Sequence, residues 1–144
     1  MCRNFINDVY KLYKQKVDLI LKERYINNVQ ILKLGGNIQM KTFYGVTFMN
    51  KEKLKEVGVF HPIKLEYYKL REEVKYNNSE VYGIEIVKTE YIGENVKVEK
   101  AIKEKIIFDE ENTDNILDLL KNGEVTPISL EDIVDDILIS KDEL

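Results

Sequence analysis

The first stretch of the chain without glycine or proline, residues 4–28, has apolar positions at helical spacing. Two neighbouring stripes follow the spacing of three or four residues that is the repeat of one side of a helix, and Lys16 and Glu23 interrupt the first of them. One stripe holds Phe5, Val9, Leu12, Leu19 and Ile26, and the other holds Ile6, Tyr10, Tyr13, Val17 and Ile20. The pattern predicts a long N-terminal helix with a wide apolar face, which suits packing against a sheet.

At about 1.5 Å per residue this helix would span about 38 Å, more than the diameter of a small domain. One end is therefore expected to project or to meet a second copy, which would give a homodimer through the N-terminal helix. The helix also carries a set of basic residues: Lys11, Lys14, Lys22 and Arg24. A solvated helix face explains them better than a nucleic-acid site, because the chain has 19 Lys but only 3 Arg.

Alternating apolar and polar positions in the middle of the chain predict strands. Residues 29–34 and 38–48 form one hairpin around the glycine turn Gly35-Gly36-Asn37, and residues 50–58 form a short helix with Asn50 as N-cap and Gly58 as stop. A second hairpin turns at Gly93-Glu94-Asn95. The strand before this turn alternates Tyr82, Ile84 and Ile86 with Gly83, Glu85 and Val87, and the strand after it places Val96, Val98, Ile102, Ile106 and Phe108 on one face.

The segment 63–76 fits two periods. Ile63, Tyr67, Leu70 and Val74 match a helix, whereas Tyr68, Leu70, Val74 and Tyr76 match one face of a strand. Periodicity alone leaves both structures open.

The last third of the chain returns to a helical period. Asp109 is a suitable N-cap for a helix that buries Ile116, Leu117, Leu119 and Leu120 and stops at Gly123. A second helix follows, capped either by Thr126 with Pro127 in its first position or by Ser129. Its buried stripe holds Leu130, Ile133, Val134 and Ile137, and its opposite face holds Glu131, Asp135 and Asp136.

These patterns predict an α+β protein with a long N-terminal helix, an antiparallel meander sheet of about five strands, and two C-terminal helices packed on the sheet. The length of 144 residues fits a single domain, residues 1–144, with one core. We expect neither a membrane span nor an export signal, because no run approaches about 18 apolar residues. The bias toward Lys, Ile and Asn is typical of an AT-rich bacterial genome, so we expect a cytoplasmic protein, in a bacterium or in the host of a phage.

The net charge of −4 is unevenly distributed along the chain. Residues 1–64 carry +7, residues 65–108 carry −1 and residues 109–144 carry −10. The basic and acidic ends either attract each other within the fold or form separate solvent-exposed faces. The remaining interpretation is that one of them binds a charged partner.

Candidate catalytic chemistry is sparse. Cys2 has no second cysteine for a disulfide or a zinc site, and His61 is the only histidine. Asp132 and Asp136 share a helix face and could bind a divalent cation weakly, although a solvated acidic face is the better interpretation. We therefore expect no catalytic residues, no cofactor and no metal site.

Two motifs carry a resemblance to a known family. One is Tyr82-Gly83-Ile84-Glu85-Ile86, and the other is Val125-Thr126-Pro127-Ile128 followed by Leu130, Asp132-Ile133-Val134 and Asp136-Ile137-Leu138. Through them residues 65–139 resemble an uncharacterised family, a domain of unknown function, of small proteins from clostridia and related Firmicutes. The resemblance implies that 65–76 is a strand, that residues 1–64 are the variable part with helix and hairpin, and that 140–144 are a tail. The family often has a histidine where this chain has Ser129, so no role of that histidine carries over.

Three functions remain open. The leading hypothesis is a non-enzymatic binding or regulatory protein that acts through protein-protein contacts. The second is a phage or mobile-element inhibitor whose acidic surface mimics nucleic acid and occupies a host nuclease or defence complex, and the third is nucleic-acid binding through the basic N-terminal helix. The partner-binding residues proposed for these functions are Glu131, Asp132, Asp135, Asp136, Lys11, Lys14, Lys22 and Arg24.

Overall fold

The computed structural model of the chain describes residues 29–34, 37–74, 79–107 and 109–142. Its sheet is an antiparallel meander in chain order, with four long strands and one short strand. The strands are β1 (Val29–Leu34), β2 (Asn37–Phe48), β3 (Ile63–Val74), β4 (Ser79–Ile92) and β5 (Asn95–Ile107), and the helical elements are α2 (Lys51–Glu56), α3 (Glu110–Asn122), η1 (Pro127–Ser129) and α4 (Leu130–Asp142). The predicted α+β class with an antiparallel sheet is confirmed, whereas the predicted N-terminal helix lies outside the described residues.

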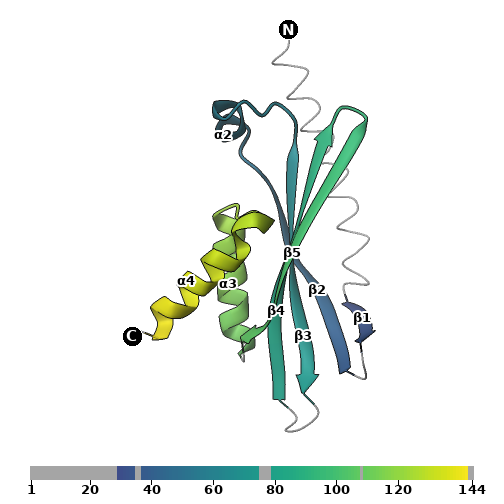
Figure 1. Cartoon of the computed structure of the whole chain (residues 1–144), viewed down its shortest axis with the longest axis vertical. Helices are drawn as coiled ribbons and strands as arrows, with labels where there is room; N and C mark the ends of the chain where they lie inside the picture. Colours follow the sequence, from purple (N-terminus) through teal and green to yellow (C-terminus); the bar gives the residue numbers. More distant parts are fainter. Residues whose placement is uncertain (1–28, 35–36, 75–78, 108, 143–144) are drawn as a thin grey trace.

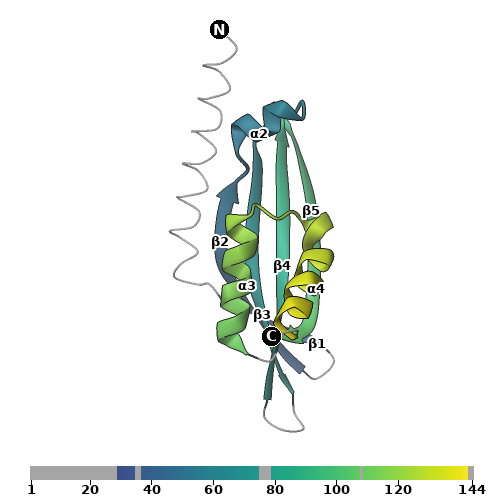
Figure 2. The same cartoon turned by 90° about the vertical axis from the view of Figure 1, so that its left-hand side faces the viewer.

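Both C-terminal helices pack on one face of the sheet, side by side, as predicted (Figures 1 and 2). The core lies between the sheet and this helical layer. It comprises Leu65, Tyr67, Tyr82, Ile84, Ile86, Ile116, Leu117, Leu120, Leu130 and Val134. Within it, the Tyr67 hydroxyl donates a 2.9 Å hydrogen bond to the backbone oxygen of Val125, which ties β3 to the loop between the helices. Burial of this hydroxyl raises the pKa of Tyr67 above its ordinary value.

The ambiguous segment 63–76 is a strand over Ile63–Val74, as the family resemblance implied. Leu65 and Tyr67 face the helices, while the intervening side chains face the other way. This alternation shows that the period of two, and not the helical period, describes the segment.

The short helix and the first C-terminal helix begin and end where the sequence predicted. The Asn50 side chain accepts hydrogen bonds from the backbone N–H groups of Glu52 and Lys53, and Gly58 has a φ of 81°. The Asp109 side chain likewise accepts from the first turn of α3, which ends at Gly123. Before the last helix, Thr126 is the N-cap residue of η1 with Pro127 in the first position, but its side chain makes no capping hydrogen bond. Ser129 is the last residue of η1 and directly precedes α4.

Two predictions need correction. Leu119 is exposed rather than packed inward, because it lies about 100° around α3 from its buried neighbour Leu120. Asn37 belongs to β2 and pairs with Leu34, so it is not part of the first turn. The prediction that Val96, Val98 and Ile102 share a face of β5 is confirmed, and that face points away from the helical layer.

The sheet is open, with β1 and β5 at its two edges. Strand β5 carries Lys97 and Glu99 near its start, joined by an ion pair of 3.0 Å.

Candidate protein-binding surface

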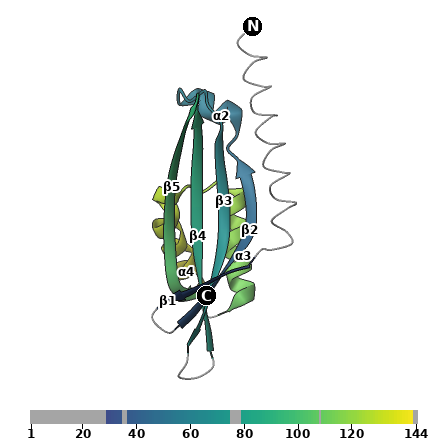
Figure 3. The same ribbon diagram turned by 90° about the vertical axis from the view of Figure 1, so that its right-hand side faces the viewer.

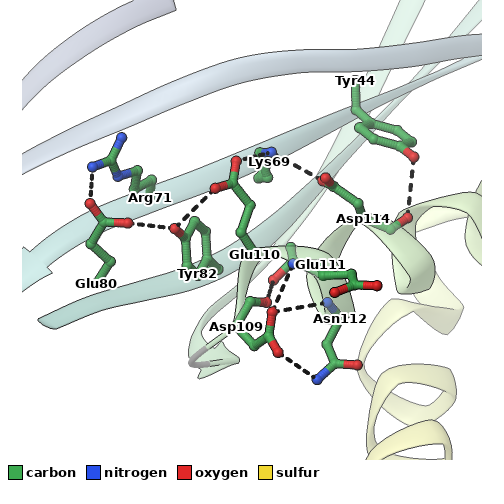
Figure 4. A network of polar contacts seen from close by, with 11 residues as sticks. Tyr44, Lys69, Arg71, Glu80, Tyr82, Asp109, Glu110, Glu111, Asn112 and Asp114 are labelled. Carbon is green, nitrogen blue, oxygen red and sulfur yellow. Dashed lines mark hydrogen bonds and ion pairs between the residues drawn. The ribbon is translucent and has the colours of Figure 1, made fainter.

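Helix α3 is fixed to the sheet by a polar network (Figure 4). Lys69 Nζ of β3 lies 2.8 Å from Glu110 Oε1 and 3.0 Å from Asp114 Oδ1. The Tyr44 hydroxyl of β2 lies 2.5 Å from Asp118 Oδ1 and 3.2 Å from the backbone oxygen of Asp114. Burial and the Asp118 carboxylate together raise the pKa of Tyr44.

The same network continues along the sheet toward the start of β4. Arg71 pairs with Glu80, and the Tyr82 hydroxyl donates to Glu80 Oε2 at 2.5 Å. Burial raises the pKa of Tyr82, and the Glu110 carboxylate raises it further. These contacts give Glu110 and Asp114 a structural role, because both carboxylates pair with Lys69 of the sheet.

The pair of Lys69 and Glu110 gives a prediction on pH dependence. Lys69 holds the pKa of Glu110 below its ordinary value, so the pair stabilises the fold at neutral pH and loses this effect as the pH falls through the folded-state value. In Lys69→Met we expect the pKa of Glu110 to rise, as measured by NMR titration of its carboxyl carbon. The accompanying stability change at neutral pH from this pair should stay below about 1 kcal/mol, because Glu110 is mostly solvated.

The matched control is Lys100→Met, which removes a lysine that is exposed on the other side of the sheet. An unchanged titration of Glu110 in Lys69→Met would show that the ion pair does not form in solution.

Two of the acids proposed as partner-binding residues are held by the sheet. Lys103 Nζ of β5 lies 3.1 Å from Asp135 Oδ1 and 3.2 Å from Glu131 Oε1, both in α4. Asp135 and Glu131 raise the pKa of Lys103 in turn. The contacts dock α4 onto the edge strand, so these two carboxylates serve the fold at least in part.

The other two acids are exposed. Asp132 and Asp136 lie one turn apart on α4 and are both directed to solvent. The structure thus divides the four acids into a sheet-bound pair and a solvent-facing pair. The basic residues proposed with them, Lys11, Lys14, Lys22 and Arg24, lie outside the described residues.

Three large apolar side chains share the helical layer with these acids. Ile128 of η1 is 89% exposed, and Leu119 of α3 and Ile139 of α4 are each 57% exposed. We call the exposed part of this layer the acidic helical surface; it comprises Glu111, Asp118, Leu119, Ile128, Glu131, Asp132, Asp136 and Ile139. Sequence reasoning missed its apolar members, although the angular position of Leu119 on the helix was the available signal.

Elsewhere, His61 Nε2 lies 3.0 Å from Glu90 Oε1. A carboxylate of this kind can orient an imidazole, but a nucleophile must also be in reach for covalent catalysis. The neighbouring charges Lys88 and Lys97 join Glu90 in a salt-bridge cluster at this end of the sheet.

Cys2 lies outside the described residues, and the described part of the chain has no group of three or more His, Cys, Asp or Glu residues that could hold a metal ion.

The fold and this surface define a small α+β domain, an antiparallel sheet with a helical layer on one face and an acidic exterior. The chain belongs to the family of unknown function DUF6514, whose model matches residues 46–140. This confirms the resemblance to a domain of unknown function and extends it, because the last three residues of β2 and all of α2 lie within the matched range. Residues 46–64 therefore belong to the family, and the expectation that all of residues 1–64 are a variable part was wrong. No match was found among curated proteins or among solved structures.

Within the described ranges, no helix is both long and apolar enough to cross a membrane.

Proposed function

We propose that this protein is a non-enzymatic binding protein that docks a basic protein partner on the acidic helical surface. The observation that carries the proposal is the exposure of Ile128, Leu119 and Ile139 on the same helical layer as exposed carboxylates such as those of Asp132 and Asp136. Exposed apolar area rimmed by polar residues is typical of protein-protein contact sites, and these three side chains would provide such area. Buried on binding, they would supply affinity, while the surrounding carboxylates would steer a basic partner into place.

The solvent-facing acids support the same function. Glu110, Asp114, Glu131 and Asp135 pair with lysines of the sheet, whereas Asp132 and Asp136 are exposed and lie near the apolar side chain of Ile139 along α4. Acids that contribute nothing to the helix-sheet interface remain free to contact a partner.

The second candidate is an inhibitor that mimics nucleic acid, and the spacing of Asp132 and Asp136 favours it. Their carboxylates repeat at one helical turn on the exterior of α4, which resembles a row of phosphates. The exposed apolar side chains distinguish the two proposals, because a phosphate mimic has no need of them. Nucleic-acid binding through the basic N-terminal residues stays a prediction.

The test is purification of the tagged full chain from its native host at low and moderate salt, with the partner's affinity then measured directly. For Ile128→Ser combined with Asp132→Asn and Asp136→Asn we expect at least about a tenfold loss of affinity, which corresponds to about 1.4 kcal/mol. The matched control, Val57→Ser with Glu52→Gln and Glu94→Gln, changes an exposed apolar and two exposed acidic residues at the other end of the molecule.

A partner bound equally by both variants would reject the acidic helical surface. A nuclease as the partner would favour the inhibitor, particularly if Asp132→Asn with Asp136→Asn weakened binding and Ile128→Ser did not. Recovery of the chain alone, as a homodimer, would overturn both proposals.

A further inference from the structure

Figure 3 shows the sheet face that points away from α3 and α4. This face carries exposed apolar side chains along β5. Val96 is 60% exposed, Val98 is 58% and Ile102 is 48%. We call this face the open face; cross-strand pairing places these residues opposite Tyr91, Thr89 and Glu85 of β4. An apolar margin of this kind is stabilised when another element covers it.

The centre of the open face is filled by side chains that lie across the strands. Lys41 of β2 reaches over β3 to Glu85 of β4, with its Nζ 2.5 Å from Glu85 Oε2 and 4.2 Å from the centre of the Tyr68 ring. The Phe43 ring packs edge-on against Tyr68 at 5.6 Å. Because these side chains extend parallel to the sheet, they form a flat surface on which a helix could pack.

Of the helices in the described ranges, both long ones lie on the opposite face. A helical layer on one side only leaves the open face without equivalent cover from these elements. The sequence supplies a segment with a complementary pattern, residues 4–28. It has two adjacent apolar stripes, one from Phe5 to Ile26 that Lys16 and Glu23 interrupt, and one from Ile6 to Ile20.

We propose that residues 4–28 of the same chain cover the open face. The dimensions agree, because 25 helical residues span about 38 Å and the 13 residues of β5 span about 43 Å. The chain also enters the sheet on the correct side: β1, which begins at Val29, lies on the side away from α3 and α4 (Figure 1). A segment joined directly to β1 reaches this face at high effective concentration.

This arrangement also places the charges of residues 4–28, which sum to +2. With the apolar stripes turned to the sheet, Lys11, Lys14 and Lys22 point away from it. These lysines would then lie on one side of the sheet and the acidic helical surface on the other. This proposal does not depend on the proposed function, because it concerns the opposite face of the sheet and is tested by a different experiment.

Paramagnetic relaxation measured by NMR on the full chain tests the proposal. In a Cys2→Ser background, a spin label at Lys100→Cys lies on the open face between Val98 and Ile102. We expect it to broaden the amide signals of residues 4–28 strongly. A label at Glu111→Cys, exposed on the helical layer, is the matched control and should leave most of those signals intact.

A second variant checks the same contact by hydrogen exchange. Val96→Asp with Val98→Asp should reduce the protection of amides in residues 4–28 at least about tenfold while β3 and β4 stay protected. Leu119→Asp with Ile128→Asp places the same change on the helical layer and should leave that protection unchanged. These exposed positions lie outside the core, so folding is expected to survive.

Three results would overturn the proposal: no broadening from Lys100→Cys, equal broadening from both labels, or unchanged protection in the Val96→Asp, Val98→Asp variant. Broadening that passes from a labelled molecule to an unlabelled one, with the mass of a dimer, would also overturn it, because the occupant would then be the segment of a second copy.

Discussion

Gly83→Ala should destabilise the protein by about 3 kcal/mol or more, which would lower the melting temperature by about 6–12 °C. A Cβ at Gly83 would lie 2.6 Å from the backbone oxygen of Lys103 and 3.1 Å from Glu104 Cα. Backbone atoms cannot move aside without disturbing the pairing of β4 with β5, whose register already shifts between Tyr82 and Ile84. The measurement is urea unfolding of the full chain, followed by circular dichroism.

Gly45→Ala is the matched control, because Gly45 is also buried and also follows a tyrosine. Its Cβ would meet the end of the Lys121 side chain, with Cδ at 3.1 Å and Nζ at 3.2 Å. That flexible end can shift, so we expect a loss below about 1 kcal/mol. Equal losses at the two glycines would contradict the close approach of β5 to Gly83.

Lys41→Met is the second substitution with a large expected effect, a loss of about 3 kcal/mol. It removes the partner of Glu85, whose side chain is only 4% exposed, and leaves a carboxylate buried on the open face. Removing one member of a buried ion pair typically lowers the stability by about 3–5 kcal/mol. Because the Lys41 side chain is 20% exposed, the pair is only partly buried, and we expect a loss at the lower end of this range. Urea unfolding at neutral pH measures it.

The double variant Lys41→Met with Glu85→Leu tests this explanation. Replacing both charges with apolar groups should restore most of the stability, because no unpaired charge remains. Glu85→Leu alone should cost less than Lys41→Met, since the longer Lys41 side chain can turn toward water. A double variant no more stable than Lys41→Met would show that packing, and not charge, accounts for the loss.

Local patterns were sufficient to predict most of the elements. Period two predicted the strands around Ile84, and cap residues such as Asp109 and Gly123 predicted the limits of α3. The segment 63–76 needed more, because two periods fit it and only its place beside β2 and β4 makes it a strand.

Surface properties were harder to predict, because they depend on distant partners. Which acids stay exposed on α3 and α4 depends on Lys69 and Lys103, and Lys103 lies 28 positions before Glu131. Burial of Glu85 could not be predicted either, because alternation in β4 suggested one buried face, whereas Lys41 pairs with Glu85 on the open face and leaves its side chain only 4% exposed. The tertiary fold, and not the helix pattern, therefore divides these carboxylates into paired and exposed ones.

The open sheet has a consequence for behaviour at high concentration. An uncovered edge strand can pair with the edge of another molecule and begin aggregation. Strand β5 is one such edge, and the ion pair of Lys97 and Glu99 places charge beside it near its start. Pairing of β5 with a strand of another molecule would require both charged groups to lose water. Because charge beside an edge is one means by which natural sheets avoid such pairing, we expect the Lys97–Glu99 pair to oppose growth of the sheet at β5.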